Sequence, residues 1–232
     1  MKIITYNTWQ LPFTRDKKLR LIKLVSFLKE QDFDIINLQE LWLVKDRNYV
    51  MKNFSHYYAI HSFTGPVINK SGLLTLIKKK KGRKIVSQGI NYFPFTKYHT
   101  LKEKIGKKGY LKIIFSNNNK QINLVNTHTF DISLPGSKLV NESNVSLIEK
   151  PILKENKVIL SGDFNLCFKD MYKITKFPFV CKEKTYEHDE LYVSEKIDDK
   201  LDYIFYKGFR KGKHAIIHYG FSDHLGIVCE LK

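Results

Sequence analysis

Cysteine is scarce in this sequence of 232 residues, and its three copies, Cys167, Cys181 and Cys229, share no repeated spacing. An odd count without such spacing argues against a disulfide framework and against a zinc site. Long apolar runs are also lacking, since none approaches the roughly 20 residues that a membrane-spanning helix needs. The opening residues do not have the pattern of a secretory leader. We therefore expect an intracellular, cytoplasmic protein.

Arginine is rare too. Only 5 arginines accompany 35 lysines, and with 23 acidic residues the formal net charge is +17. Such a charge attracts nucleic acid or an anionic membrane. A composition bias in the gene is the alternative explanation, because bidentate phosphate recognition favours arginine over lysine. The densest basic cluster is 78–84, and its Gly82 predicts a solvated hairpin turn, with a binding patch as the alternative. A second cluster comprises Lys102, Lys104, Lys107 and Lys108.

The overall composition is that of an ordinary globular protein. Apolar residues make up 43% and charged residues 27%, which does not suggest disorder. We see no internal repeat, low-complexity linker or domain boundary, and the length suits one sizeable core. We therefore expect a single domain over residues 1–232.

Apolar periodicity predicts many strands and few helices. Residues 16–30 have the pattern of an amphipathic helix, with Thr14 or Asp16 as its cap. Three consecutive asparagines at 117–119 predict a hairpin turn. The other elements that we expect are helices near 45–53 and within 137–149, and strands at 34–39, 56–62, 72–77, 84–91, 109–116, 121–127, 157–161, 201–206, 213–218 and 226–231. This composition favours two packed sheets with helices outside.

Several short apolar runs end in a carboxylate, an amide or an imidazole. Glu40 closes one such run and Asn7 closes another. Because Mg²⁺ prefers oxygen ligands and retains several waters, one or two carboxylates suffice to hold it. Glu40 can supply that ligand, Asn7 can add an amide oxygen or orient a phosphoryl group, and Asp223 can bind the metal directly or through water.

The remaining polar groups fit a hydrolytic reaction. Asp163 and Asn165 are two residues apart, so in extended geometry both point to one side, where they can hold a water and a phosphoryl oxygen. His224 can exchange a proton near neutral pH, and Asp202 is the candidate partner that fixes its tautomer. His128 can donate a hydrogen bond to a phosphate oxygen. The six other histidines, at 56, 61, 99, 188, 214 and 218, have no such setting.

In their order, these motifs resemble the endonuclease/exonuclease/phosphatase (DNase I-like) superfamily over nearly the whole chain. The resemblance rests on Asn7, Gln39-Glu40, Asn126-Thr127-His128, Gly162-Asp163-Phe164-Asn165, Leu201-Asp202-Tyr203 and Ser222-Asp223-His224. It implies an α/β protein with a four-layer α/β/β/α sandwich, dependence on Mg²⁺ with Mn²⁺ as a substitute, and hydrolysis of a phosphoester by an activated water.

The resemblance also implies roles for individual residues. Glu40 would be the principal metal ligand, with Asn7 beside it and Asp223 in or near the metal shell. A second group would act on the substrate: His128 and Asn165 on the phosphoryl oxygens, Asp163 on the water, and His224 with Asp202 as general base or electrostatic clamp. Whether Asp163 or His224 takes the proton stays open at this point.

The substrate is less defined than the chemistry. The segments Asn7–Pro12, Gln39–Trp42 and Lys70–Leu74 are most similar to neutral sphingomyelinases, although Trp9 and Trp42 have a plain alternative role in packing the base of the site. Residues 91–95 suit either a lipid-touching hairpin or the edge of a core strand. Nucleic-acid phosphodiester hydrolysis, at abasic sites or 5′ ends, is the alternative activity. A non-catalytic polyanion-binding module is a further one. We expect a monomer without an obligate protein partner.

Overall fold

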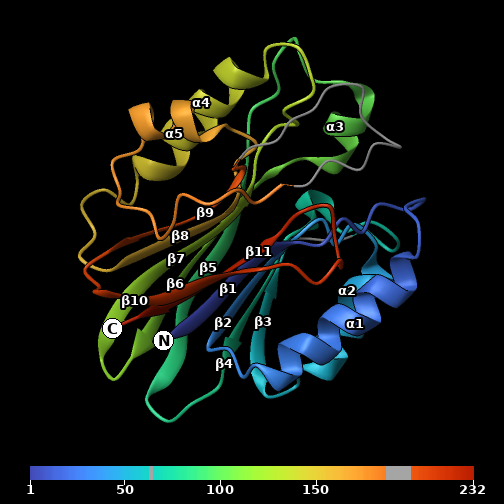
Figure 1. The fold of residues 1–232 in the computed structure, drawn as a ribbon. Coiled ribbons are helices and arrows are strands. Elements are labelled where there is room, and N and C mark those ends of the chain that lie inside the picture. The colour runs from blue at the N-terminus through green and yellow to red at the C-terminus, as the bar shows by residue number, and fades with distance from the viewer. Residues whose placement is uncertain (63–64, 187–199) are drawn as a thin grey trace.

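Two mixed β-sheets lie face to face in the described part of the computed structural model, which comprises residues 1–62, 65–186 and 200–232 (Figure 1). The first sheet has the strand order β10 (Lys211–Ile217), β11 (Gly226–Leu231), β1 (Lys2–Asn7), β2 (Ile35–Gln39), β4 (Leu74–Lys78) and β3 (Tyr57–His61). Within it, β1 and β2 are parallel and every other pair is antiparallel. The N-terminal strand therefore lies at the centre, beside the last strand of the chain.

The second sheet has a similar plan. Its order is β5 (Arg83–Tyr92), β6 (Gly109–Asn117), β7 (Lys120–His128), β8 (Val158–Asp163) and β9 (Asp202–Lys207). Here β7 and β8 are the parallel pair. Each sheet thus contains one parallel pair, and the carboxyl ends of both pairs carry the polar residues that close their apolar runs.

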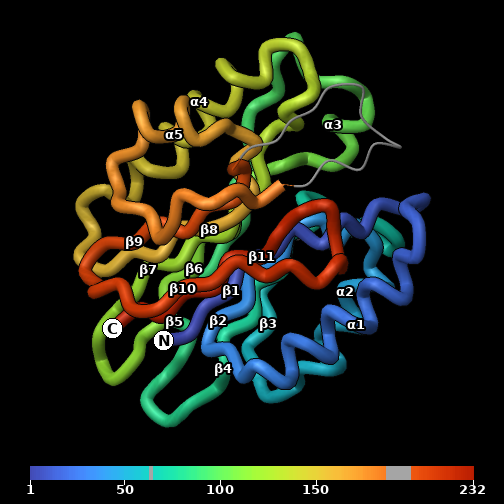
Figure 2. Tube along the Cα trace, in the orientation of Figure 1, coloured from blue at the N-terminus to red at the C-terminus, as the bar shows by residue number. Residues whose placement is uncertain are grey.

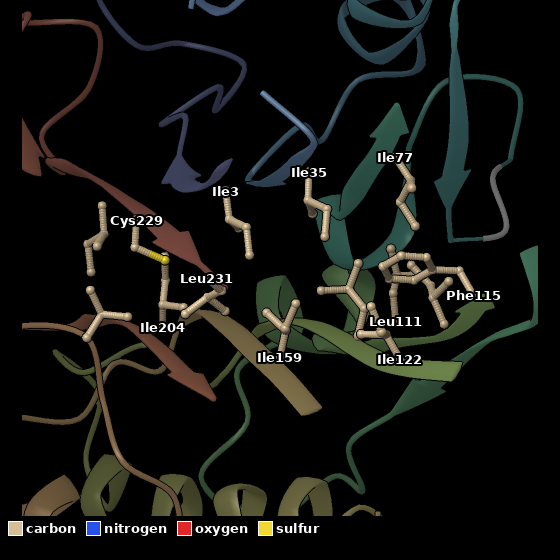
Figure 3. Close-up of a cluster of buried hydrophobic side chains, with 14 of the residues drawn as sticks. Ile3, Ile35, Ile77, Leu111, Phe115, Ile122, Ile159, Ile204, Cys229 and Leu231 are labelled. Atoms are coloured by element: carbon tan, nitrogen blue, oxygen red, sulfur yellow. The ribbon is translucent and has the colours of Figure 1, made fainter. Parts of the chain in front are cut away.

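The main core fills the space between the sheets. Figure 3 shows Ile3, Ile35 and Ile77 of the first sheet facing Leu111 and Ile159 of the second. All of these side chains are buried. Full burial of such a side chain is worth roughly 1.5–3 kcal/mol, so this layer fixes how the two sheets stack.

Helices cover the outer faces. The first sheet is covered by α1 (Lys17–Glu30), beside which α2 (Val44–Asn53) lies, and the second by α4 (Ser137–Glu149) and α5 (Phe168–Ile174) (Figure 2). Each outer layer has its own apolar cluster, centred on residues such as Leu24 and Ile148. The result is the predicted four-layer α/β/β/α sandwich. None of the helices in the described residues is long and apolar enough to cross a membrane.

Most of the predicted elements are confirmed to within a few residues, and the exceptions have physical reasons. Helix α1 begins after Asp16, but that residue has a left-handed backbone (φ 50°) and its side chain makes no capping hydrogen bond. The Thr14 hydroxyl does not cap either, since it accepts a hydrogen bond from the Arg20 guanidinium at 2.8 Å. The predicted side-chain cap is therefore wrong. The predicted hairpin at 117–119 is confirmed, with Asn118 and Asn119 both left-handed.

The sequence interpretation missed three short helical elements. They are the 3₁₀ turn η1 (Lys70–Gly72) and the helices α3 (Leu101–Gly106) and α5. Each is seven residues or shorter, which is too short for apolar periodicity to reveal. The turn η1 also corrects the strand expected at 72–77, because β4 begins only at Leu74.

The lysine cluster at 78–84 is a solvent-exposed turn, as predicted, but it does not close a hairpin. Strand β4 belongs to the first sheet and β5 to the second, so the chain crosses between the sheets here. Arg83 is buried at the crossing and donates to Asp34 Oδ1 at 3.2 Å, while Lys80 Nζ lies 2.6 Å from the same oxygen. Residues 91–95 are not a hairpin either: they leave the end of β5, with Phe93 buried and Phe95 exposed.

Candidate active site

The carboxyl ends of the two parallel strand pairs meet at one edge of the sandwich. Asn7 ends β1 and pairs in register with Gln39 of β2, which puts Glu40 one residue beyond the strand. His128 ends β7 and pairs with Asp163 of β8. A hydrogen bond of 2.9 Å from Asn7 Nδ2 to Asp163 Oδ2 joins the two sheets. Side chains far apart in the sequence are therefore close together in space.

The backbone around these side chains is strained. Glu40 (φ 61°) and Asn165 (φ 46°) both have left-handed conformations outside glycine. Such conformations cost of order 1–3 kcal/mol each and persist only where the surroundings impose them. The left-handed turn at Asn165 corrects the extended geometry that we predicted for Asp163 and Asn165. Instead, the backbone N–H of Asn165 donates to Asp163 Oδ1 at 2.9 Å. Both side chains still line the same cavity.

Gly162 makes the approach of β8 to β7 possible. Its φ is +142°, and a Cβ at this position would lie 2.0 Å from the Thr127 carbonyl oxygen. Any other residue would push the strand end away from its neighbour. The glycine therefore sets the position of Asp163 relative to His128.

His224 and Asp202 form a buried pair. The His224 Nδ1 and Asp202 Oδ2 atoms are 2.8 Å apart, as expected for a hydrogen bond that fixes the tautomer. Burial by itself lowers the pKa of His224, but the charges of Asp202 and Asp163 outweigh it and hold that pKa well above its usual value. Thr185 positions Asp202, because its hydroxyl accepts the Asp202 amide hydrogen at 2.9 Å. The charges of Asp202 and Asp163 thus favour the protonated, cationic form of His224.

His128 has the opposite charge state. Burial and the nearby charges of Lys108 and His224 hold its pKa well below the usual value, so the ring is neutral. Its Nε2 lies 3.5 Å from Asp163 Oδ2 and 3.7 Å from Glu40 Oε1. A neutral ring with hydrogen on Nε2 can donate to an oxygen placed between these groups.

Three carboxylates make the site strongly acidic. Burial raises the pKa of Glu40 and of Asp163, and it raises the pKa of Asp223 to about 6. Glu40 Oε2 is buried without a hydrogen-bond partner among the described residues. A bound divalent cation would compensate both features, so the oxygen-rich donor set fits Mg²⁺. Asp163, Asp202 and His224 also have ligand atoms within 4.8 Å of one another, but His224 Nδ1 is already bonded to Asp202.

The Asn7 amide is turned so that its nitrogen faces the carboxylates. Nδ2 donates to Asp163 and, at 3.3 Å, to Glu40 Oε1, while Oδ1 accepts the Trp9 amide hydrogen at 3.1 Å. In this arrangement Asn7 orients Glu40 and Asp163. Its predicted role as a metal ligand stays a prediction.

One cavity collects these groups. Its volume is about 380 Å³, and its lining includes Glu40, His128, Asp163, Asn165, Asp223 and His224. Asn7 and Asp202 lie directly behind that lining, bonded to Glu40, Asp163 and His224. All eight predicted site residues are therefore brought together. Of the other six histidines, five lie outside the cavity lining, and His188 is outside the described residues.

Lys108 is a functional candidate that the sequence interpretation passed over. It is a mostly buried cation in the cavity lining: burial lowers its pKa, but Glu103, Asp131 and the site carboxylates outweigh that effect and raise it. Its Nζ lies 3.5 Å from Glu103 Oε1. In the sequence Lys108 was one lysine of a basic cluster, and nothing there distinguished it from the exposed Lys104. Tyr186 was also missed; its ring packs 4.9 Å from that of His224.

The two tryptophans flank the site. Trp42 packs beneath it, with its ring centroid 6.0 Å from that of His128. Trp9 lines the cavity and lies beneath the Arg20 guanidinium at 4.5 Å. These contacts confirm the packing alternative for Trp42 and give Trp9 a position on the cavity wall.

The family model described as "Endonuclease/Exonuclease/phosphatase family" matches residues 4–224. The chain belongs to that family. Phosphoester hydrolysis is therefore its chemistry, and members of the family generally use a divalent metal.

Relatives of this endonuclease/exonuclease/phosphatase family member are distant. Human sphingomyelin phosphodiesterase 2 is 31% identical over 80 residues, which span 34% of this chain and 19% of the human protein. A crystal structure of humanized D. rerio TDP2 matches with a TM-score of 0.80 at 18% identity, covering 100% of this chain and 98% of that one. A Bacteroides vulgatus family member matches with a TM-score of 0.79 at 16% identity, covering 100% and 98%. At these identities the two structures establish the shared DNase I-like fold.

Proposed function

We propose that this family member is a Mg²⁺-dependent phosphodiesterase. The observation that carries the proposal is the convergence of Glu40, Asp163 and Asp223 with the His224–Asp202 pair at one cavity. When bound, Mg²⁺ neutralises phosphoryl charge and lowers the pKa of a bound water. Glu40 and Asp223 would supply carboxylate oxygens for it, and Asn7 holds Glu40 in place.

The chain's own residues divide the remaining tasks. His128 donates from Nε2 to a non-bridging phosphate oxygen, and the Asn165 side chain supports the attacking water or a second oxygen. Asp163 takes the water proton as the water oxygen bonds to phosphorus and the ester P–O bond breaks, and the departing alkoxide takes a proton from solvent and leaves as the alcohol. The raised pKa of Asp163 makes it a stronger base than an ordinary carboxylate. His224 has no free site for that proton as an imidazolium, so it acts as the electrostatic clamp.

The alternative substrates are a phospholipid headgroup and a nucleic-acid backbone. The 80-residue similarity to a sphingomyelin phosphodiesterase supports the first. One structural relative, D. rerio TDP2, is described as complexed with a single-strand DNA product, and at 18% identity it supports the second through fold alone. A non-catalytic polyanion-binding module is least supported, because the complete polar set is retained. The cytoplasmic location and the monomeric state stay predictions.

A panel assay tests the proposal. The intact protein would be offered bis(p-nitrophenyl) phosphate, sphingomyelin, abasic duplex DNA and 5′-tyrosyl DNA, each with Mg²⁺ and with EDTA. We expect hydrolysis of at least one diester that is lost in EDTA and restored by excess Mg²⁺ or Mn²⁺. Equal rates with and without chelator would refute the metal requirement. A steep loss of DNA hydrolysis with added salt would identify the nucleic-acid substrate.

A further inference from the structure

A second cavity opens directly beside the catalytic one. Its volume is about 350 Å³, and it shares Leu11, Glu40, Lys102, Lys108 and Asp131 with the catalytic cavity. The two therefore form one continuous depression, with the lysines and Glu40 at the junction. A ligand whose phosphate lies at the catalytic groups can extend into this second space.

The second cavity, here called the tail groove, has apolar walls. They are formed mainly by Pro12, Trp42, Leu43, Val67, Ile68 and Ile105. Three of these side chains are well exposed to solvent: Val67 (63%), Ile105 (53%) and Ile68 (39%). Single exposed aliphatic residues are ordinary, but these three come from two separate segments and converge on one groove. The loop before β4 and helix α3 supply them.

The groove is preformed. The Val44 amide donates to the Val67 carbonyl at 2.9 Å, and the Asn69 amide donates to the Trp42 carbonyl at 2.7 Å. These two bonds attach one wall of the groove, which contains Val67 and Ile68, to the segment that follows β2. On the other side, α3 rests on Trp42: a Cβ at Gly106 would lie 3.1 Å from Trp42 Cζ3. The apolar walls therefore do not collapse onto each other.

The chemistry of the walls selects the occupant. A nucleobase is held by stacking on an exposed aromatic face or by hydrogen bonds to its edge. In the tail groove the exposed apolar side chains are aliphatic, and the Trp42 ring in its lining is partly buried, with Gly72 and Gly106 packed against it. A flexible hydrocarbon chain needs only apolar contact. The lysines in the lining, Lys102 and Lys108, complement the phosphate of an anionic, amphiphilic ligand.

We propose that the tail groove binds the aliphatic chain of an amphiphilic phosphodiester, of the phospholipid class, whose phosphate lies in the catalytic cavity beside Lys108. This inference rests on the proposed function and deepens it by assigning a substrate class to the same site. Glu40 and Lys108, shared by both cavities, mark the point where the polar headgroup meets the chain.

A chain-length series tests the groove. The full protein with Mg²⁺ would hydrolyse ethyl, butyl, hexyl and octyl p-nitrophenyl phosphates, all below the concentrations at which they aggregate. We expect kcat/KM to rise by up to about 4-fold for each added methylene until the groove is filled, as about 0.8 kcal/mol per buried CH₂ dictates. A kcat/KM that does not depend on chain length would overturn the proposal.

Matched variants locate the effect. Val67→Gln and Ile105→Gln should reduce the ratio of kcat/KM for the octyl and ethyl diesters at least 5-fold. Val86→Gln on β5 and Ile22→Gln on α1 replace comparably exposed aliphatic residues outside the groove, at 47% and 41% exposure, and should leave that ratio unchanged. A wild-type ratio in both groove variants would overturn the proposal. The proposal would also be overturned if the protein preferred thymidine 5′-p-nitrophenyl phosphate over the alkyl diesters and Val67→Gln and Ile105→Gln abolished that preference. Such a result would indicate a nucleic-acid site.

Binding without turnover separates this inference from the proposed function. In EDTA, quenching of tryptophan fluorescence by the same diesters reports their binding, since Trp42 lines the groove. Affinity that rises with chain length supports the tail groove, even if no diester is hydrolysed. Absence of hydrolysis would then refute only the proposed phosphodiesterase activity. Affinity independent of chain length overturns the groove whatever the turnover.

Discussion

At the scale of single residues, the site is organised by opposite charge states of two imidazoles. His224 lies between Asp202 and Asp163 and is held as a cation, whereas His128 lies near Lys108 and His224 and is held neutral. Two copies of one residue type thus receive different tasks from their surroundings alone. The sequence could not assign these states, because both histidines simply end or precede an apolar run.

Replacing Asp202 by asparagine should convert His224 to an ordinary or weakened base. In the wild type, the His224–Asp202 pair stabilises the folded protein while His224 is protonated. This contribution to folding stability is present at low pH and is lost as the pH rises through the raised pKa of His224. In Asp202→Asn we expect that pKa to fall in an NMR titration and kcat to drop by about 10²–10³-fold. Asp170→Asn, on the surface of α5, is the control. An unchanged His224 titration would contradict the assigned pair.

Replacing Glu40 by glutamine should weaken metal binding while keeping the side chain's volume. We expect the Mg²⁺ concentration for half-maximal activity to rise at least 10-fold, with partial rescue at high Mg²⁺, because one anionic ligand is lost. Activity measured across a Mg²⁺ titration checks this, with Glu142→Gln on the outer face of α4 as control. Wild-type activation at limiting metal would remove Glu40 from the ligand set.

Lys108 should contribute to the phosphate site through its buried charge. Lys108→Met is expected to lower kcat/KM by roughly 10–100-fold and to raise the pKa of Asp163 and Glu40 further, which shifts the acid limb of the pH–rate profile upward. Lys104→Met removes an exposed lysine of α3 and should change neither quantity. A pH profile that is identical in Lys108→Met and the wild type would contradict this role.

At the scale of elements, strand ends were the most predictable part of the molecule. The runs that lead to Asn7, His128 and Asp163 all form strands, because buried strands have strong apolar patterns. Strand β1 ends at Asn7 as expected, whereas β7 and β8 extend one and two residues beyond their expected ends at 127 and 161. Short elements were not predictable: α3 and α5 have too few turns, and the turn at 79–82 connects two different sheets. Which sheet a strand joins depends on long-range packing that a local pattern does not contain.

Strand β8 provides the sharpest test at this scale. Gly162→Ala should destabilise the protein by about 2–4 kcal/mol, since the new methyl group meets the Thr127 carbonyl of β7 and the backbone conformation disfavours it. Gly89→Ala on β5 is the matched control, because no atom lies within 4 Å of the added carbon, and it should be neutral or slightly stabilising. Urea unfolding measures both. Equal stability of the two variants would show that β7 and β8 can separate without cost.

At the scale of the whole molecule, the layered architecture followed from the sequence, and so did the set of residues at the site. The roles of these residues could be predicted less well from the sequence. The identity of the proton acceptor, the orientation of the Asn7 amide and the position of the Lys108 charge all depend on distances across the two sheets. The single domain over residues 1–232 remains our proposal. The apolar groove beside the site was also hidden, because its walls come from loops and a six-residue helix.

The charge balance of the whole site should make metal binding depend on pH. The folded-state pKa of Asp223 is raised to about 6 from an ordinary value of 3.8. Its contribution to stability is therefore present at low pH and is lost as the pH rises through about 6, unless a cation compensates the charge. We expect Mg²⁺ to raise the melting temperature more at pH 7.5 than at pH 5 in thermal unfolding scans. In Asp223→Asn this difference should shrink, and an equal Mg²⁺ effect at both pH values would contradict it.

Strand β1 lies between β2 and β11, so one of its partners is encoded near the start of the chain and the other near the end. During synthesis on the ribosome, the second edge of β1 stays uncovered until β11 has been translated. Nascent chains that stall before β10 would expose that edge to aggregation or to chaperones. The strand that positions Asn7 is thus translated before both of its neighbours in the sheet and is completed only after β11.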